Sequence, residues 1–167
     1  MPTPTSIPTN TPTPIPTPNL LFNGPFDQNG NSWLLPWSLT TTIANTTIRQ
    51  DATNKIDGPY SAEISLPTAG STDHDVQLNQ ANISLVTRKT YTLSFWAKAS
   101  SNTSVRLAIR HGVSPWTAYF GQSVSLTPTW QKYILTFTVS QKDTNGMVNF
   151  NLSQNVANIW LDAVTLQ

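Results

Sequence analysis

The sequence predicts an all-β protein built as an antiparallel β-sandwich of the jelly-roll type. Apolar and polar residues alternate with a period of two in several short segments, which are rich in β-branched and aromatic residues. Clusters of Asn, Gly, Ser and Pro separate these segments at short intervals, and helix signals are scarce. Many short strands with such spacing are typical of a sandwich or a jelly roll.

The strand pattern recurs along the chain. It is clearest in residues 60–66, where Ala62, Ile64 and Leu66 alternate with polar residues. The predicted strands span residues 60–66, 75–78, 91–99, 105–110, 130–139, 148–153 and 159–166. Turns are predicted between strands at residues 57–59, 69–71, 100–102, 127–128 and 145–146, each of which contains Gly, Pro, Asn or Ser.

The chain divides into a linker and one domain. Seven of the 13 prolines lie in residues 1–18, where Pro and Thr alternate without any charged or aromatic residue. Such a stretch cannot bury a core, so it predicts an extended, semi-rigid linker near polyproline II geometry. Residues 19–167 have the length of a single domain. Linkers of this kind separate the modules of secreted proteins, so we expect the protein to be extracellular.

Composition excludes several classes of protein. Only 10% of the 167 residues are charged, and 9 Lys and Arg against 8 Asp and Glu give a net charge of +1. This balance predicts no nucleic-acid partner, because nucleic-acid binders usually carry a basic stripe. No apolar run reaches the roughly 18 to 20 residues of a membrane span, so no membrane partner is expected. The absence of cysteine excludes disulfides and cysteine-ligated metals. We expect a monomer.

Strand alternation also predicts which side chains leave the core. Successive side chains of a strand point to opposite faces, so inward apolar residues place their polar neighbours outward. The outward residues are Gln77, Trp96, Lys98, Arg106, Arg110, Asn149 and Asn151. If these strands share one sheet, its outer face suits a sugar, because amides and guanidinium groups bond to hydroxyls while aromatic rings stack on pyranose faces. Taken singly, the amide residues are ordinary surface.

The tryptophans favour the binding hypothesis. Of the six in the chain, Trp116 lies in a loop with Gly and Pro, and loop aromatics often serve recognition. Trp33 and Trp37 flank residues 34–36, so one of them can fill the core while the other is exposed. The pattern does not separate the two.

Several ordered segments of residues 19–167 resemble one family. They are the opening NLLFNGPFD at 19–27, WSL at 37–39, DGPYSA at 57–62, VQL at 76–78, YTLSFWAKA at 91–99, LTPTWQKY at 126–133 and IWLDAVTL at 159–166. Each is weak alone, but their order and spacing are fairly specific. The chain resembles the carbohydrate-binding modules of families 4, 9, 16 and 22, and most of all families 4 and 16, which fold as β-jelly rolls.

This resemblance implies a non-catalytic module that holds a polysaccharide chain in a cleft across one sheet, and that is attached to a secreted glycoside hydrolase or related enzyme. In the family, a pair of aromatic residues holds the sugar chain, and polar residues of the cleft lie beside them. The matching positions are Trp116, Trp37, Trp33, Gln77, Trp96, Arg110, Arg106 and Asn149. The expected ligand is a β-1,4-linked glucan or mannan ahead of xylan.

The resemblance also implies a structural calcium ion. In the family, an acidic residue of the opening strand and an Asp of the closing strand meet at the ion, with backbone carbonyls near the glycine turn. By position these are Asp27, Asp162 and the backbone of Lys55 in the segment 55–57. Calcium takes six to eight oxygen ligands and accepts carbonyls beside carboxylates. Asp27 stands where Glu is common in the family, so it is one methylene shorter.

Three alternatives stay open. Arg106, Arg110 and Lys98 can recognise uronic acids, since guanidinium pairs with carboxylate, but they can equally donate to neutral hydroxyls, which the family favours. A small lyase or hydrolase would need a pair of carboxyl groups, and the domain offers Glu63 as its only Glu, with Asp73 and Asp75 flanking His74. A third hypothesis is an adhesion or spacer module that binds protein.

Overall fold

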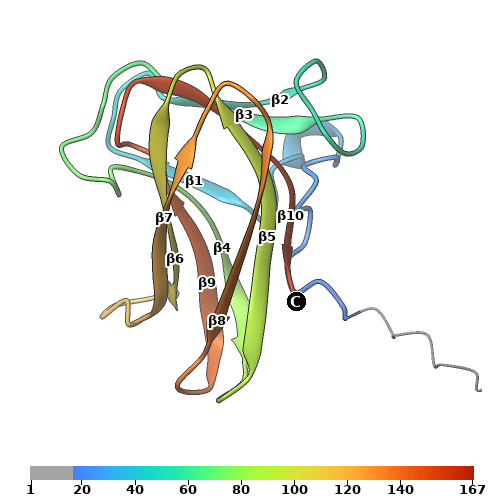
Figure 1. The fold of residues 1–167 in the computed structure, drawn as a ribbon, viewed down its shortest axis with the longest axis vertical. Coiled ribbons are helices and arrows are strands. Elements are labelled where there is room, and N and C mark those ends of the chain that lie inside the picture. The colour runs from blue at the N-terminus through green and yellow to red at the C-terminus, as the bar shows by residue number, and fades with distance from the viewer. Residues whose placement is uncertain (1–16) are drawn as a thin grey trace, which may run out of the picture.

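The protein is a sandwich of two five-stranded antiparallel sheets, seen in a computed structural model that describes residues 17–167 (Figure 1). The all-β jelly-roll prediction is therefore confirmed. The predicted linker over 1–18 lies outside the described residues, apart from residues 17 and 18. The elements in chain order are η1 (Gly30–Ser32), β1 (Ser38–Thr41), β2 (Thr47–Asp51), β3 (Ser61–Leu66), β4 (Val76–Leu85), β5 (Thr90–Ala99), β6 (Thr103–His111), β7 (Ala118–Leu126), β8 (Gln131–Thr138), β9 (Asp143–Asn151) and β10 (Ala157–Leu166).

The strands alternate between the two sheets. Sheet A has the order β1-β4-β9-β6-β7, and sheet B has the order β2-β3-β10-β5-β8. From β4 to β10 the chain changes sheet at every connection except the β6–β7 hairpin. Because the chain alternates between the sheets, most strands that are neighbours in a sheet are far apart in sequence. The long strands β5 and β10 are neighbours in sheet B, and they run along the long axis of the molecule, as does β9 of sheet A (Figure 1).

Aromatic rings join the two sheets in the core. Phe95 of β5 meets Phe150 of β9 edge to face, with ring centroids 5.2 Å apart. Trp37 packs against Phe150 at 6.1 Å and against Phe26 at 5.6 Å. The indole nitrogen of Trp37 donates hydrogen bonds to the carbonyls of Phe22 and Asn23 at 3.1 Å each, so this buried ring also has its polar atom satisfied.

The structure contains strands that the alternation pattern did not predict, namely β1, β2 and β7, and it extends β4 by seven residues beyond the predicted end at 78. The turn predicted at 145–146 is wrong, because both residues lie inside β9. Gly146 is needed there for close packing, since a Cβ atom at this position would lie 2.7 Å from Leu85 Cδ1 and 2.9 Å from the Ile83 carbonyl oxygen.

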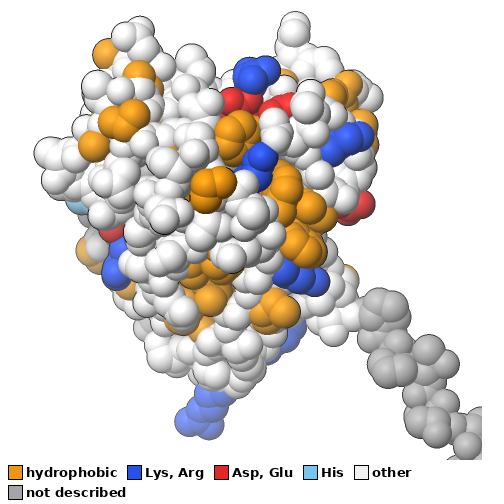
Figure 2. Space-filling model, turned by 45° about the horizontal axis from the view of Figure 1, so that its top comes forward, with side chains coloured by type: hydrophobic (Ala, Val, Ile, Leu, Met, Phe, Trp, Pro, Cys, Tyr) orange, Lys and Arg blue, Asp and Glu red, His pale blue; other side chains and the backbone are white. Residues whose placement is uncertain are grey.

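The surface is mostly uncharged. On the face shown in Figure 2, Lys and Arg side chains lie scattered among uncharged neighbours and do not gather into a stripe. This agrees with the even balance of charges in the sequence. Within residues 17–167, no helix has the length and hydrophobicity needed to cross a bilayer.

Candidate functional site

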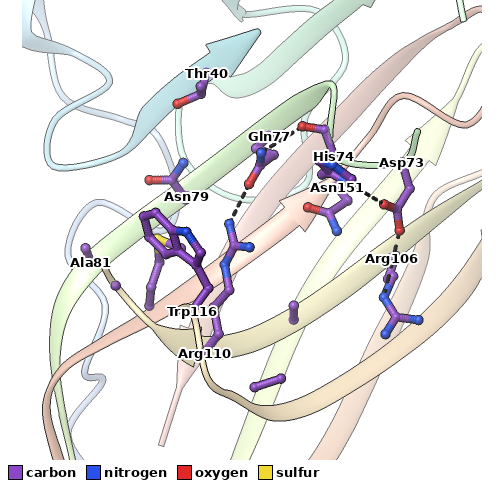
Figure 3. A pocket seen from close by; sticks show the side chains of 14 residues that line it. Thr40, Asp73, His74, Gln77, Asn79, Ala81, Arg106, Arg110, Trp116 and Asn151 are labelled. Carbon is purple, nitrogen blue, oxygen red and sulfur yellow. Dashed lines mark hydrogen bonds and ion pairs between the residues drawn. The ribbon is translucent and has the colours of Figure 1, made fainter. Parts of the chain in front are cut away.

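A cleft of about 750 Å³ lies on the outer face of sheet A (Figure 3). That volume is in the usual range for a site that binds a small ligand. Its floor comes from outward positions of the strands, and its two ends come from loops. Small side chains at Ala81, Ala108 and Ala118 leave the space open. The lining residues are Thr40, Asp73, His74, Gln77, Asn79, Ala81, Arg106, Ala108, Arg110, Gly112, Trp116, Ala118, Met147 and Asn151.

Strand register arranges the floor in rows. Thr40 of β1 is opposite Gln77 of β4, Gln77 is opposite Asn151 of β9, and Asn151 is opposite Arg106 of β6. One row of polar side chains therefore crosses four strands. The next row contains Asn79, Asn149 and Ala108, since β9 pairs with both neighbours through Asn149. Alternation along each strand keeps these side chains on the same outer face.

Trp116 forms one end of the cleft. It lies in the loop between β6 and β7, and 47% of its surface is exposed. Its φ of 58° is in the left-handed region, which bulky residues rarely adopt, so the loop holds this ring in a defined position. The base of the loop is closed by the His111 amide, which donates to the Thr117 carbonyl at 2.8 Å, and by the Gly112 amide, which donates to the Asn145 carbonyl at 2.7 Å.

A chain of contacts runs along the cleft floor from Trp116. The guanidinium carbon of Arg110 lies 5.2 Å from the centroid of the Trp116 ring. Arg110 Nη2 donates to Gln77 Oε1 at 2.6 Å, and Gln77 Nε2 donates to the His74 carbonyl at 2.7 Å (Figure 3). Burial lowers the pKa of Arg110, while the charge of Asp73 opposes that shift. The predicted residues Trp116, Arg110 and Gln77 are thus brought together in one network.

Charged side chains form the other end. Arg106 Nε lies 3.8 Å from Asp73 Oδ2, and His74 Nδ1 lies 3.2 Å from Asp73 Oδ1 (Figure 3). Among the described residues that line the cleft, Asp73 is the only acid. The predicted residue Arg106 therefore faces the cleft with a carboxylate beside it.

Asn149 lies under the cleft floor. It is fully buried, its side-chain amide donates to Asn151 Oδ1, and its own Oδ1 has no hydrogen-bond partner among the described residues. Asn149 points to the same outer face as Asn79 and Ala108, as predicted, but neighbouring residues cover its side chain. It supports Asn151 and does not itself line the cleft.

Two predicted tryptophans are outside the cleft. Trp37 is 1% exposed in the core between the sheets, so its ring cannot stack on a ligand, and its assignment to the binding set is corrected. Trp33 is half-buried and packs against the core next to η1, away from the cleft lining. Of the two alternatives left by the sequence, Trp37 is the residue that fills the core.

Trp96 and Lys98 belong to the other sheet. Both lie on β5 in sheet B, where Trp96 is opposite Asp162 of β10. The ammonium nitrogen of Lys98 lies 4.6 Å from the Trp160 ring centroid and 2.5 Å from Asn54 Oδ1. The prediction that these residues share a face with Arg110 is wrong, because strand alternation gives the side of a sheet and not which sheet contains the strand.

Comparisons with known proteins identify the family. The family model described as carbohydrate binding domain matches residues 18–157. The chain belongs to this family. A solved structure described as "CBM4 structure and function" is 30% identical, with a TM-score of 0.69, and the match covers 87% of this chain and 99% of that one. The search of curated protein sequences gives no significant match.

More distant structures share the fold of the module. The second N-terminal cellulose-binding domain of Cellulomonas fimi β-1,4-glucanase C is 24% identical, with a TM-score of 0.67, over 89% of this chain and 93% of that domain. The CBM22-1 xylan-binding domain of Paenibacillus barcinonensis Xyn10C is 12% identical, with a TM-score of 0.65, over 90% of this chain and 94% of that domain. The resemblance to carbohydrate-binding modules found in the sequence is confirmed.

The predicted metal ligands Asp27 and Asp162 lie near each other at sheet B, whose central strand β10 carries Asp162. Asp162 of β10 is fully buried under the loop between β2 and β3, and its Oδ2 accepts the backbone amides of Ile56 and Asp57 at 2.7 and 3.0 Å. Asp27 Oδ1 accepts the Tyr60 amide at 3.1 Å. Burial raises the pKa of Asp162, and the charge of Asp27 raises it further.

These residues fit a cation. Burial also raises the pKa of Asp27, with a further contribution from the charge of Asp57, so the local environment disfavours negative charge without a counter-ion. Gly58 has a φ of 60°, and a Cβ there would lie 1.8 Å from Asp27 Oδ2, so the turn leaves room only for the carboxylate. Within residues 17–167, no three His, Cys, Asp or Glu side chains gather as a metal site, so backbone carbonyls, such as that of Lys55, would have to complete a calcium shell.

Two of the acids considered for catalysis, Glu63 and Asp75, are engaged elsewhere, whereas Asp73 lines the cleft. Glu63 lies on the outer side of sheet B, where it pairs with Arg49 at 2.5 Å and accepts a hydrogen bond from Asn158. Asp75 accepts hydrogen bonds from the Thr72 amide and from the hydroxyls of Ser71 and Thr72, which lower its pKa to about 2. Neither faces the cleft.

Sequence reasoning missed part of the cleft. Asn79 and Ala81 follow Gln77 at intervals of two, so a longer β4 would have included them. Ala108 lies between the two arginines of β6, where a small outward residue signals a hollow. His74 lies in a turn ahead of β4, and no signal in the sequence indicates that this turn is at the end of a cleft.

Proposed function

We propose that the module binds one chain of a β-1,4-linked polysaccharide in the sheet A cleft without cleaving it, with glucan or mannan ahead of xylan. The observation that carries this proposal is the row of polar side chains that crosses four strands beside the exposed ring of Trp116. Such a floor offers directional hydrogen bonds to hydroxyls along an extended chain, and the ring offers a stacking surface for a pyranose.

The comparisons support a ligand of this class. Membership of the carbohydrate-binding family agrees with a cleft that contains amides, guanidinium groups and one tryptophan. Structures described as cellulose-binding and xylan-binding domains share the fold. Because one ring and a set of solvent-accessible hydrogen bonds do the binding, we expect a dissociation constant on the order of micromolar.

The Pro/Thr-rich segment suggests how the module works in its parent protein. We expect a monomeric, secreted module that a linker over residues 1–18 tethers to a glycoside hydrolase or a related catalytic domain. An extended linker keeps the two domains at a short distance, so binding to the polysaccharide raises the concentration of enzyme near its substrate.

A calcium ion held by Asp27, Asp162 and backbone carbonyls including that of Lys55 is part of the proposal. The ion would tie the N-terminal segment and the β2–β3 loop to β10, and it would offset the charge of two carboxylates. Its role is structural, because this site is on sheet B and the cleft is on sheet A.

The test is binding of oligosaccharides to Trp116→Ala and to Trp96→Ala, measured by titration calorimetry with cello-, manno-, xylo- and laminari-oligosaccharides. Trp116→Ala should weaken binding at least about tenfold, because a stacking contact contributes about 0.5–1.5 kcal/mol beyond the buried area. Trp96→Ala is the matched control on the other sheet, and it should bind like the wild type.

Other results would reject the proposal. Failure of every oligosaccharide to bind would exclude a polysaccharide ligand of this class. If Trp96→Ala lost affinity and Trp116→Ala did not, the binding site would be on sheet B. Release of reducing sugars by the purified module would show an enzyme, and capture of a protein partner unaffected by free sugars would show an adhesion module.

A further inference from the structure

The cleft contains one positive charge that no acid balances. Its charged lining residues are Asp73, Arg106 and Arg110, with His74 beside them. Asp73 lies next to Arg106 and His74, at 3.8 and 3.2 Å. Arg110 forms no ion pair within the part of the chain that the structure describes. The cleft therefore carries one positive charge in excess, and this charge is at Arg110, which Asp73 influences without forming an ion pair.

Arg110 is held in place with most of its donors unused. A guanidinium group has five N–H donors, and within residues 17–167 only Nη2 has a partner, the side-chain oxygen of Gln77 at 2.6 Å. Gln77 cannot easily turn away, because its own amide donates to the His74 carbonyl. Arg110 Nε is buried and has no hydrogen-bond partner among the residues that the structure describes, and the Trp116 ring covers one side of the group. A partly buried cation in this state favours an anionic ligand.

We propose that the cleft recognises a polysaccharide that contains a hexuronic acid, whose carboxylate pairs with the terminal nitrogens of Arg110 while its ring lies against Trp116. This rests on the proposed function: it keeps a β-1,4-linked chain in the sheet A cleft and replaces the neutral sugar next to Arg110 with a hexuronic acid. The planar fork of a guanidinium matches a carboxylate with two parallel hydrogen bonds. A hexuronic acid also keeps the pyranose ring that an aromatic side chain stacks on.

A neutral hydroxyl uses this geometry less well. It accepts a hydrogen bond from Arg110 but leaves the partly buried charge without a counter-ion. A carboxylate instead accepts two parallel hydrogen bonds from one guanidinium, which adds both energy and geometric specificity. Arg106 offers no equivalent site, since Asp73 already lies beside it, and Lys98 is on the other sheet. The three cationic residues that alternation placed together are thus separated by the structure, and Arg110 alone is suited to a carboxylate.

The experiment compares two probes that differ only at C6. Cellohexaose and the same β-1,4-linked hexamer with its C6 hydroxyls oxidised to carboxylates are titrated into the module at pH 7, at low and at physiological salt. The oxidised probe should bind at least about tenfold more tightly, and the preference should shrink as salt rises, because a charged contact is screened. Arg110→Gln should remove the preference, and Arg110→Lys, which keeps the charge without the fork, should retain part of it.

Arg88→Gln is the matched control, because it removes the same side chain from an exposed turn between β4 and β5. It should keep the full preference, and thermal melts of each variant show whether it is folded. Equal affinity of the wild type for the two hexamers would overturn this inference while leaving the proposed function intact. Binding of neither would overturn both. A C6-sulfated hexamer that binds more tightly than the carboxylate would also reject the hexuronic acid.

Discussion

Asp143 is a buried carboxylate under the loop that carries Trp116. Its Oδ2 accepts the hydroxyl of Tyr119 at 2.8 Å and lies 2.9 Å from His111 Nδ1, while its Oδ1 accepts the Asn145 amide at 2.8 Å. These contacts join β6, β7 and β9 at the end of the cleft. The carboxylate therefore fixes the base from which Trp116 projects, although it is not part of the cleft lining.

Asp143→Asn should flatten the response of stability to acid. Burial opposes ionisation, but hydrogen bonds from Asn145, His111 and Tyr119 outweigh it and hold the pKa of Asp143 below its ordinary value. A depressed pKa stabilises the folded state above the unfolded value of about 4, and this contribution is lost as pH falls below it. Melting temperatures from pH 3 to 7 test this. At pH 7 the variant should lose about 1–3 kcal/mol, and an unchanged difference from wild type at every pH would contradict it.

The loop between β2 and β3 is held by hydrogen bonds from its backbone amides to carboxylates. It covers Asp162 through the amides of Ile56 and Asp57, and Gly58 turns the chain past Asp27. Asp51 at the end of β2 supports the start of this loop, since its Oδ1 accepts the Thr53 amide at 2.7 Å. The loop is thus held largely by carboxylates, and a cation that binds them would stabilise it.

Chelation should lower the melting temperature of the wild type and leave Asp27→Asn unaffected. A ligand bound only by the folded state stabilises it by about 2.7 kcal/mol at 100 times its dissociation constant. For a domain of this size that corresponds to roughly 5–10 °C. Differential scanning calorimetry with EDTA and with added calcium measures the shift. An identical melt under both conditions would rule out a structural calcium, and an equal shift in Asp27→Asn would place the ion elsewhere.

Strand prediction succeeded where one face is buried and failed at the edges. In β5 the burial alternates residue by residue, which is the condition under which apolar and polar residues alternate in sequence. The missed strands β1 and β7 are the edges of sheet A, and β2 is an edge of sheet B. Edge strands bury less of each face, so their sequences lack a clear period. The edge strand β8 was predicted because Leu135 and Phe137 are buried.

The assignment of strands to sheets is a property of the whole molecule. Alternation correctly turned Trp96 and Arg110 away from the core, but β5 pairs with β10 and β8 while β6 pairs with β9 and β7. No local pattern contains that information, because the chain changes sheet at nearly every connection. The resemblance to a family instead supplied one long-range contact, since it placed Asp27 near Asp162, 135 positions later in the sequence.

The two ends of the described chain close the sandwich together. The Leu20 amide donates to the Leu166 carbonyl at 2.8 Å, and the Leu166 amide donates to Asn19 Oδ1 at 2.8 Å. Leu21 is 4% exposed in the core. The folded unit therefore includes Asn19.

Removal of residues 1–18 should leave melting temperature and oligosaccharide affinity unchanged, whereas removal of residues 1–22 should destabilise the module. The longer deletion loses the hydrogen bonds to Leu166 and the buried side chain of Leu21, which alone contributes about 2 kcal/mol. Calorimetric melts and titration of both truncated proteins provide the measurement. A fall in stability after the shorter deletion would show that the linker packs on the domain. Equal stability of the two would show that the N-terminal segment adds nothing to the sandwich, and the boundary at residue 19 would then be too early.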